Sequence, residues 1–193
     1  MGSIKDMIIR DTVFEVSAFF LMVIAAMFCA RCDLVEVTSR QSGHVLVVIV
    51  GGLGESQMKD ITAALSNSDA TVVSASSWDG YKLDIAAEIK GHESDQIILV
   101  GHSFGGQAVL DACKALPAVH IQEVILIDPV AYGSGGTDLP ANAGKVTVFT
   151  RTDWFGPWVA VIQGTTPIPV PGSHNDIPHS TVVINYIRKE VAQ

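Results

Sequence analysis

The sequence predicts an α/β fold in which a mostly parallel sheet carries helices on both faces. Continuous apolar runs, typical of strands buried on both sides, alternate with stretches in which apolar residues recur at helical spacing. In addition, a glycine-rich turn at 51–54, Ser103 and Asp128 each fall at the carboxyl end of one of these runs. Sheets of this type place their sites at the carboxyl ends of strands, so this coincidence favours a functional edge.

The first 32 residues differ in character from the rest of the chain. Residues 16–30 are apolar apart from a serine, and Lys5 and Arg10 precede them. An apolar run of this length is typical of a signal peptide and short for a membrane-spanning helix. We expect an N-terminal hydrophobic helix within 1–32 that is a signal peptide or a membrane anchor, with residues 13–30 associating with the membrane. The protein would then be exported or anchored; a helix buried in the domain would instead make it cytoplasmic.

After a polar linker at 33–43, strands and helices alternate through a domain expected at 44–193. The runs expected to form strands are 44–50, 70–74, 97–100, 124–127 and 145–150. The residues expected to mark helices are Met58, Ile61 and Leu65; Tyr81, Ile85 and Ile89; 107–116; and Val183, Ile187 and Val191. Ser56 and Ser180 stand where the first and last of these helices would be capped.

The overall composition fits one globular domain and excludes several kinds of partner. The chain has 193 residues, of which 48% are hydrophobic and 17% charged, and its formal net charge is −8. This is enough apolar content for a core. Because an acidic chain repels phosphate groups, we expect no nucleic-acid partner and no electrostatic docking on anionic lipid.

Residues 101–105, Gly-His-Ser-Phe-Gly, form a G-x-S-x-G motif between an expected strand and an expected helix. In a nucleophile elbow, the serine occupies a strained turn, and the glycines two positions before and after it relieve clashes. The turn exposes the hydroxyl, and the amide of the next residue points at the developing oxyanion. The sequence therefore predicts Ser103 as a nucleophile and Phe104 as an oxyanion donor; the alternative is a glycine-rich turn without chemistry.

A serine hydroxyl needs a base within hydrogen-bond reach and a third group that orients this base. In this kind of fold the chain order is serine, acid, histidine. Asp128 is the preferred acid because it ends the strand at 124–127, one strand after Ser103. Asp153, which follows the strand at 145–150, is the alternative acid.

The order leaves two histidines as candidate bases, both in the loop before the last helix. His174 follows Gly-Ser and lies deeper in this loop, whereas His179 adjoins the expected cap Ser180. We therefore prefer His174 as the base and keep His179 as the alternative. His102 is expected to pack beside the elbow, because neighbours on a tight turn point apart.

The second oxyanion amide is expected from the turn at 51–54, from Leu53 or alternatively from Gly52. This turn lacks the spacing of a dinucleotide fingerprint and the ending of a P-loop, so it does not indicate a nucleotide site. The three cysteines and the histidines show no metal-ligand spacing. We expect no cofactor and no metal.

Together these segments resemble the α/β-hydrolase superfamily, in particular small lipase- and esterase-like serine hydrolases. The segments that carry the resemblance, within 44–193, are 48–54, 101–106, 127–130 and 172–174. An acid at Asp128 resembles the arrangement in pancreatic-type lipases. Gly51-Gly52 replaces the usual His-Gly, which leaves the second amide donor open. The short segment at 130–145, where many members insert a helical lid, implies a minimal fold without a lid domain.

The resemblance implies a serine hydrolase that cleaves acyl esters through a covalent acyl-enzyme. Ser103 would attack, His174 would move the proton and Asp128 would orient His174, with a small-molecule or lipid acyl group as substrate. The same triad would serve a thioesterase or an acyltransferase. A catalytically silent α/β-hydrolase-like binding protein is the third hypothesis, which a fluorophosphonate probe separates from the others.

Overall fold

The computed structural model describes seven stretches of the chain: 36–39, 44–52, 58–75, 81–92, 95–130, 138–152 and 162–193. The chain divides into two compact units, Met1–Asp33 and Leu34–Gln193, and all described residues belong to the second. The predictions on the apolar segment within 1–32, on Leu53, on Asp153 and on most of the short segment where a lid would stand lie outside the described residues. Across the described stretches, no helix is both long and apolar enough to span a bilayer.

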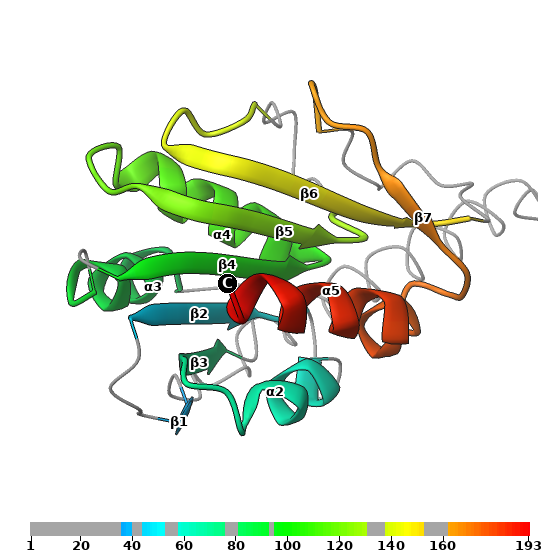
Figure 1. The fold of residues 1–193 in the computed structure, drawn as a ribbon. Helices are drawn as coiled ribbons and strands as arrows, with labels where there is room; N and C mark the ends of the chain where they lie inside the picture. The colour runs from blue at the N-terminus through cyan, green and yellow to red at the C-terminus, as the bar shows by residue number, and fades with distance from the viewer. Residues whose placement is uncertain are drawn as a thin grey trace, which may run out of the picture. The chain divides into compact units, whose positions relative to one another are not determined.

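The strands form one seven-stranded sheet in the order β1-β3-β2-β4-β5-β6-β7 (Figure 1). They are β1 Glu36–Ser39, β2 Val45–Val50, β3 Thr71–Ala75, β4 Gln96–His102, β5 Ile121–Ile127, β6 Ala143–Arg151 and β7 Ile168–Val170. Only the pairing of β1 with β3 is antiparallel, and the other neighbours in the sheet are parallel. The prediction of a mostly parallel sheet is therefore confirmed.

Helices cover both faces of this sheet. They are α2 Lys59–Leu65, α3 Tyr81–Lys90, α4 Phe104–Ala115 and α5 Thr181–Val191, with the 3₁₀ helix η2 Ile177–His179 before α5. α3 packs with α4 on one face and α2 with α5 on the other, and Figure 1 shows α5 in front of the strands and α4 behind them.

The core follows from the alternation of side chains along buried strands. In β2, Leu46 and Val48 join the apolar cluster under α3 and α4, whereas Val47 and Ile49 join the cluster under α2 and α5. All of these residues are buried, and each such side chain contributes about 1.5–3 kcal/mol. A continuous apolar run is what a strand between two helical layers requires.

The expected linker and the loop before the last helix differ from the sequence-based prediction. Residues 36–39, placed in the polar linker, form β1, because a short edge strand needs a hydrogen-bonded neighbour on one side and no apolar run. The sheet therefore includes residues before 44. β7 and η2 were not predicted either, since both are three residues long and contain a proline, which suits an edge strand and a helix start.

Candidate active site

Ser103 lies in a strained turn between β4 and α4. Its backbone has φ 57° and ψ −125°, a conformation that costs a residue with a Cβ about 1–3 kcal/mol. The neighbouring elements hold it there: its N–H donates to the carbonyl of Ile127 at 3.1 Å, and its own carbonyl accepts from Val130 at 3.1 Å. The strain is therefore maintained by β5 and the residues after it. This is the geometry expected of a nucleophile elbow.

The two glycines of the motif allow α4 to pack closely against β4 and β2. A Cβ on Gly101 would lie 2.6 Å from the carbonyl oxygen of Gly105, and a Cβ on Gly105 would collide with the carbonyl oxygen of Val50. Real Cβ atoms do not come this close to backbone. The glycines are thus required by close approach.

The end of β2 lies directly against the serine. A Cβ on Gly52 would stand 2.7 Å from Cβ and 3.0 Å from Oγ of Ser103, so only a residue without a side chain fits. Backbone of the turn after β2 therefore lies beside the nucleophile, where a second oxyanion amide is required. Gly52 is described, and Leu53, the preferred donor, lies outside the described residues.

Asp128 follows β5 directly and is fully buried. Its backbone has φ 39°, and its N–H donates to the carbonyl of Phe149 at 2.7 Å, which fixes the carboxylate at the sheet edge. The Oδ2 atom of Asp128 lies 2.5 Å from Nδ1 of His174, whose side chain is 28% exposed. A carboxylate at this distance assigns the proton of the neutral ring to Nδ1 and leaves Nε2 as the basic nitrogen.

The loop that carries His174 is closed by its own hydrogen bonds. Oδ2 of Asp176 accepts from the hydroxyl of Ser173 at 2.6 Å and from its backbone N–H at 2.9 Å. These two bonds hold the pKa of the Asp176 carboxyl below its usual value. Gly172, at φ 126°, lets the chain enter this turn. A tight turn here presents His174 to the sheet edge.

The alternative base has a different partner. Nδ1 of His179 lies 2.7 Å from Oδ2 of Asp60, so this histidine connects η2 to α2. The structure therefore brings His174, and not His179, to Asp128.

His102, the residue before Ser103, is buried and touches the loop that carries His174. Its Nε2 lies 3.1 Å from the carbonyl oxygen of His174, and the two imidazole rings have centroids 4.6 Å apart, tilted by 32°. Burial, reinforced by the nearby charge of His174, lowers the pKa of His102 to about 4. At neutral pH this ring is uncharged.

Arg151 was missed by sequence reasoning. It ends β6, the neighbour of β5, and its Nε lies 3.0 Å from Oδ2 of Asp128 without hydrogen-bond alignment. The other carboxylate oxygen, Oδ1, has no hydrogen-bond partner among the described residues. The strands expected at 124–127 and 145–150 were both placed in the parallel sheet, and Arg151 directly follows the second, so a charged residue at this strand end was the signal available.

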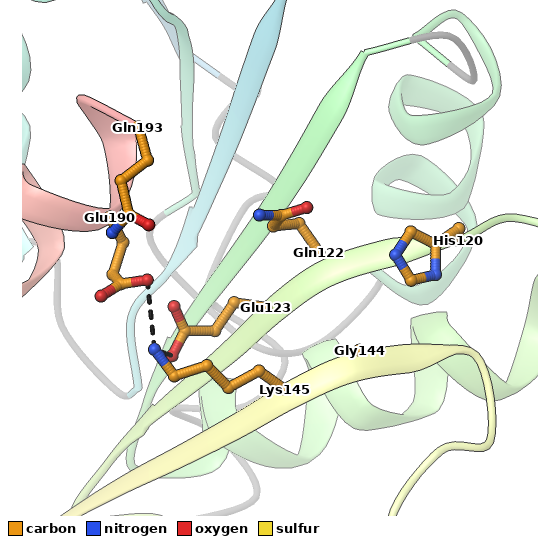
Figure 2. Close-up of a pocket in the computed structure, with 7 residues that line it drawn as sticks. All are labelled: His120, Gln122, Glu123, Gly144, Lys145, Glu190 and Gln193. Carbon is orange, nitrogen blue, oxygen red and sulfur yellow. Dashed lines mark ion pairs between the residues drawn. The ribbon is translucent and has the colours of Figure 1, made fainter.

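A cavity of about 340 Å³ lies at the opposite end of β5 (Figure 2). Its lining residues are His120, Gln122, Glu123, Gly144, Lys145, Glu190 and Gln193. Beside it, Oε1 of the buried Glu123 accepts from Thr147 at 2.6 Å and from the Tyr186 hydroxyl at 2.7 Å. Lys145 lies 3.3 Å from Glu123 and 3.1 Å from Glu190, the ion pairs dashed in Figure 2.

We call Glu123, Thr147, Tyr186, Lys145 and Glu190 the amino-end cluster. It contains no hydroxyl paired with an imidazole, so it lacks the elements of nucleophilic catalysis. In the part of the chain that the structure covers, no three histidine, cysteine or carboxylate side chains gather as metal ligands.

Comparison with known proteins shows which fold the chain has. No protein-family model and no curated protein matches the chain. Among solved structures, the type II thioesterase BorB from the borrelidin biosynthetic cluster superposes with a TM-score of 0.60 at 10% identity, over 84% of this chain and 99% of that one. The chain has an α/β-hydrolase-like fold. The thioesterase domain NocB from the nocardicin cluster gives a TM-score of 0.56 at 15% identity, over 82% and 99%.

Other α/β-hydrolase-like neighbours match less of their own length. The chain spans 47% of a lipase-esterase related protein from Clostridium acetobutylicum, with a TM-score of 0.41 and 17% identity. At such identities the likenesses show the fold and do not extend to activity. The chemistry of this α/β-hydrolase-like protein must therefore be argued from its own side chains.

Proposed function

We propose that the protein is a serine hydrolase that cleaves acyl esters through an acyl-enzyme on Ser103. The observation that carries this proposal is the 2.5 Å contact between Nδ1 of His174 and the buried carboxylate of Asp128. This pair lies at the sheet edge where Ser103 holds its strained turn. A base oriented by a buried acid, next to a serine at an elbow, is the arrangement that activates a hydroxyl.

The steps follow from the positions of these groups. Nε2 of His174 accepts the proton of Ser103 as Oγ attacks the acyl carbonyl, and Asp128 stabilises the resulting imidazolium. The amide of Phe104, first residue of α4, and an amide of the turn at 52–53 stabilise the oxyanion. His174 then returns the proton to the leaving group, and a water molecule, deprotonated by the same nitrogen, releases the acyl group.

A thioester is the second candidate substrate. The neighbours with TM-scores above 0.5 named above are thioesterases, and the same groups would attack a thioester carbonyl. Transfer to an acceptor other than water would use the same acyl-enzyme. A small-molecule or lipid acyl group suits both reactions.

The test is hydrolysis of p-nitrophenyl esters and acyl thioesters of graded chain length, together with labelling by a fluorophosphonate. Ser103→Ala is expected to abolish labelling and to lower kcat by several orders of magnitude. Ser66→Ala, which removes an exposed hydroxyl at the C-cap of α2, is the matched control and should behave as the wild type. A wild-type protein that neither hydrolyses nor labels would instead be a silent binding protein.

We also propose that the apolar segment at 16–30 directs the protein to export or to a membrane. Its motivation is the run at 16–30, which is apolar apart from one serine. Fractionation of cells that express the full chain, against a chain lacking residues 1–32, tests this. Equal recovery of both in the cytoplasm would contradict it.

A further inference from the structure

A buried imidazole, His102, joins the strand that ends in the nucleophile to the loop that carries the candidate base. It is the last residue of β4 and pairs with Ile127, the residue before Asp128. Its Nε2 lies 3.1 Å from the carbonyl oxygen of His174, and its ring packs against the His174 ring. Through its backbone and its side chain, this one residue thus adjoins the elements of all three candidate catalytic residues.

The hydrogen bond defines the tautomer of His102. A carbonyl oxygen only accepts, so Nε2 of His102 must carry the hydrogen and donate it. Nδ1 is then a lone-pair acceptor; it is buried and has no hydrogen-bond partner among the described residues. A buried acceptor without a partner lowers the stability of the fold. An apolar ring would fill this space without that loss.

A side chain that costs stability in the core indicates a role in the site. The Asp128 carboxylate holds the ring of His174, whereas His102 holds its backbone. Burial lowers the pKa of His102 to about 4, so the ring is uncharged near neutral pH. The hydrogen bond to the His174 carbonyl then holds this uncharged ring in its Nε2–H tautomer. Two anchors, on the backbone and on the ring, fix the direction in which Nε2 of His174 points.

We propose that His102 is a positioning residue that aims the base, by donating its Nε2–H to the His174 carbonyl and by packing against the His174 ring. Its effect on the rate rests on the proposed function, but its hold on the loop does not. The residue itself transfers no proton.

Three substitutions separate the donor from the ring. His102→Phe keeps an aromatic ring and removes both the donor and the unpaired acceptor. His102→Gln keeps an amide donor that reaches the place of Nε2, whereas His102→Asn carries the same amide too short to reach it. His120→Phe, at an exposed histidine away from this site, is the matched control.

We expect His102→Phe to fold with an unchanged or higher Tm and to lose about 10–100-fold in kcat, with a much smaller change in KM. Amide exchange at 173–177 should become faster. His102→Gln should recover most of kcat and the slow exchange, His102→Asn should not, and His120→Phe should match the wild type. If His102→Phe does not fold, the proposal is tested by the difference in kcat and in amide exchange between His102→Gln and His102→Asn.

The proposal would be overturned if His102→Phe kept the kcat and the exchange rates of the wild type. It would also be overturned if kcat of His102→Gln were no higher than kcat of His102→Asn. ¹⁵N NMR of the wild-type imidazole adds an independent measurement: the Nε2–H tautomer is expected, and an Nδ1–H tautomer would refute it. If the wild type hydrolyses nothing, the proposed function fails. The exchange and tautomer measurements then still decide whether His102 holds the loop.

Discussion

Strand β5 carries a buried carboxylate near each end, and the two have similar surroundings. Asp128 at the carboxyl end is 0% exposed and Glu123 near the amino end is 1% exposed. Each has a cation from β6 beside it, Arg151 or Lys145, and each has one oxygen with no hydrogen-bond partner among the described residues. By burial and charge alone, the two sites could not be told apart.

The two sites differ in the side chain that contacts each carboxylate besides the cation from β6. His174 contacts Asp128 with one ring nitrogen and has a second ring nitrogen besides, whereas Tyr186 contacts Glu123 through its single hydroxyl. Although burial alone would lower it, hydrogen bonds with Tyr186 and Glu190 raise the pKa of Lys145, so this ammonium stays charged. A buried carboxylate therefore indicates catalysis only when its partner can exchange a proton at working pH beside a nucleophile.

Removing this contacting side chain at each end should give the largest contrast. His174→Ala should lower kcat/KM by about 10⁴–10⁶-fold, since no base remains for Ser103. Tyr186→Phe should leave kcat/KM within about threefold and lower the free energy of unfolding by about 1–2 kcal/mol, because Glu123 loses one hydrogen bond. Ester hydrolysis and urea denaturation measure the two quantities.

His179→Ala is the control for the histidine substitution. Its ion pair with Asp60 is partly exposed, so its loss should cost less than about 1 kcal/mol and little activity. An inactive His179→Ala beside an active His174→Ala would move the base five positions along the chain.

Neutralising the carboxylates should give the next largest contrast. Asp128→Asn should lower kcat by up to about 10⁴-fold while the fold persists, because the amide would favour the wrong tautomer of His174. Glu123→Gln should leave kcat unchanged and destabilise the fold by about 1–3 kcal/mol, because Lys145 loses its buried partner. Steady-state kinetics and thermal unfolding distinguish these outcomes. A larger loss of kcat in Asp153→Asn than in Asp128→Asn would reassign the acid.

Acid should destabilise the protein through His102, which lies at the carboxyl end of β4. Its pKa is about 4 in the folded protein against 6.5 as the ordinary value, so below pH 6.5 the unfolded chain binds a proton that the fold excludes. Stability is therefore fully present above pH 6.5 and falls by up to about 3 kcal/mol as the pH drops to 4. His174, Asp128 and His179 are the titratable groups whose charges act on this ring.

The difference between wild type and His102→Phe isolates this contribution from the other titrating groups. In urea unfolding at pH 7, 5.5 and 4, the free energy of unfolding should fall less with acid for His102→Phe than for the wild type. Parallel curves for both would contradict the assignment of the pH dependence to His102.

The cations from β6 should give the smallest contrast. Arg151→Gln should lower kcat by less than about tenfold, since the contact of His174 with Asp128 remains. Lys145→Gln should leave kcat unchanged. Because each pair joins a partly exposed cation to a buried carboxylate, each loss leaves that carboxylate without its cation and should cost about 1–3 kcal/mol of stability, measured by urea unfolding. A loss of activity in Lys145→Gln would erase the distinction between the two ends.

The parts of the fold that depend on local pattern could be predicted from the sequence. The strands before Gly51, Ser103 and Asp128 are continuous apolar runs, and their parallel order places these residues at one sheet edge. The structure has Ser103, Asp128 and His174 at this edge, and their catalytic roles remain predictions.

Partners that come from distant elements could not be predicted. The strand expected at 124–127 begins at Ile121, because Glu123 is stabilised inside it by Thr147 on β6 and Tyr186 on α5. No local pattern marks a charged residue as buried when its partners lie on other strands and helices. The hydrogen bond from His102 to the loop of His174 is of the same kind.

The missing side chain at Gly52 has a practical consequence for protein engineering. Because a Cβ there would press on both Cβ and Oγ of Ser103, a library that varies the turn after β2 should keep this codon fixed. In Gly52→Ala the new methyl group would press on Ser103, which would keep its hydroxyl. Under the proposed function, such a variant would silence the protein by a steric change and would bind acyl compounds without reacting with them.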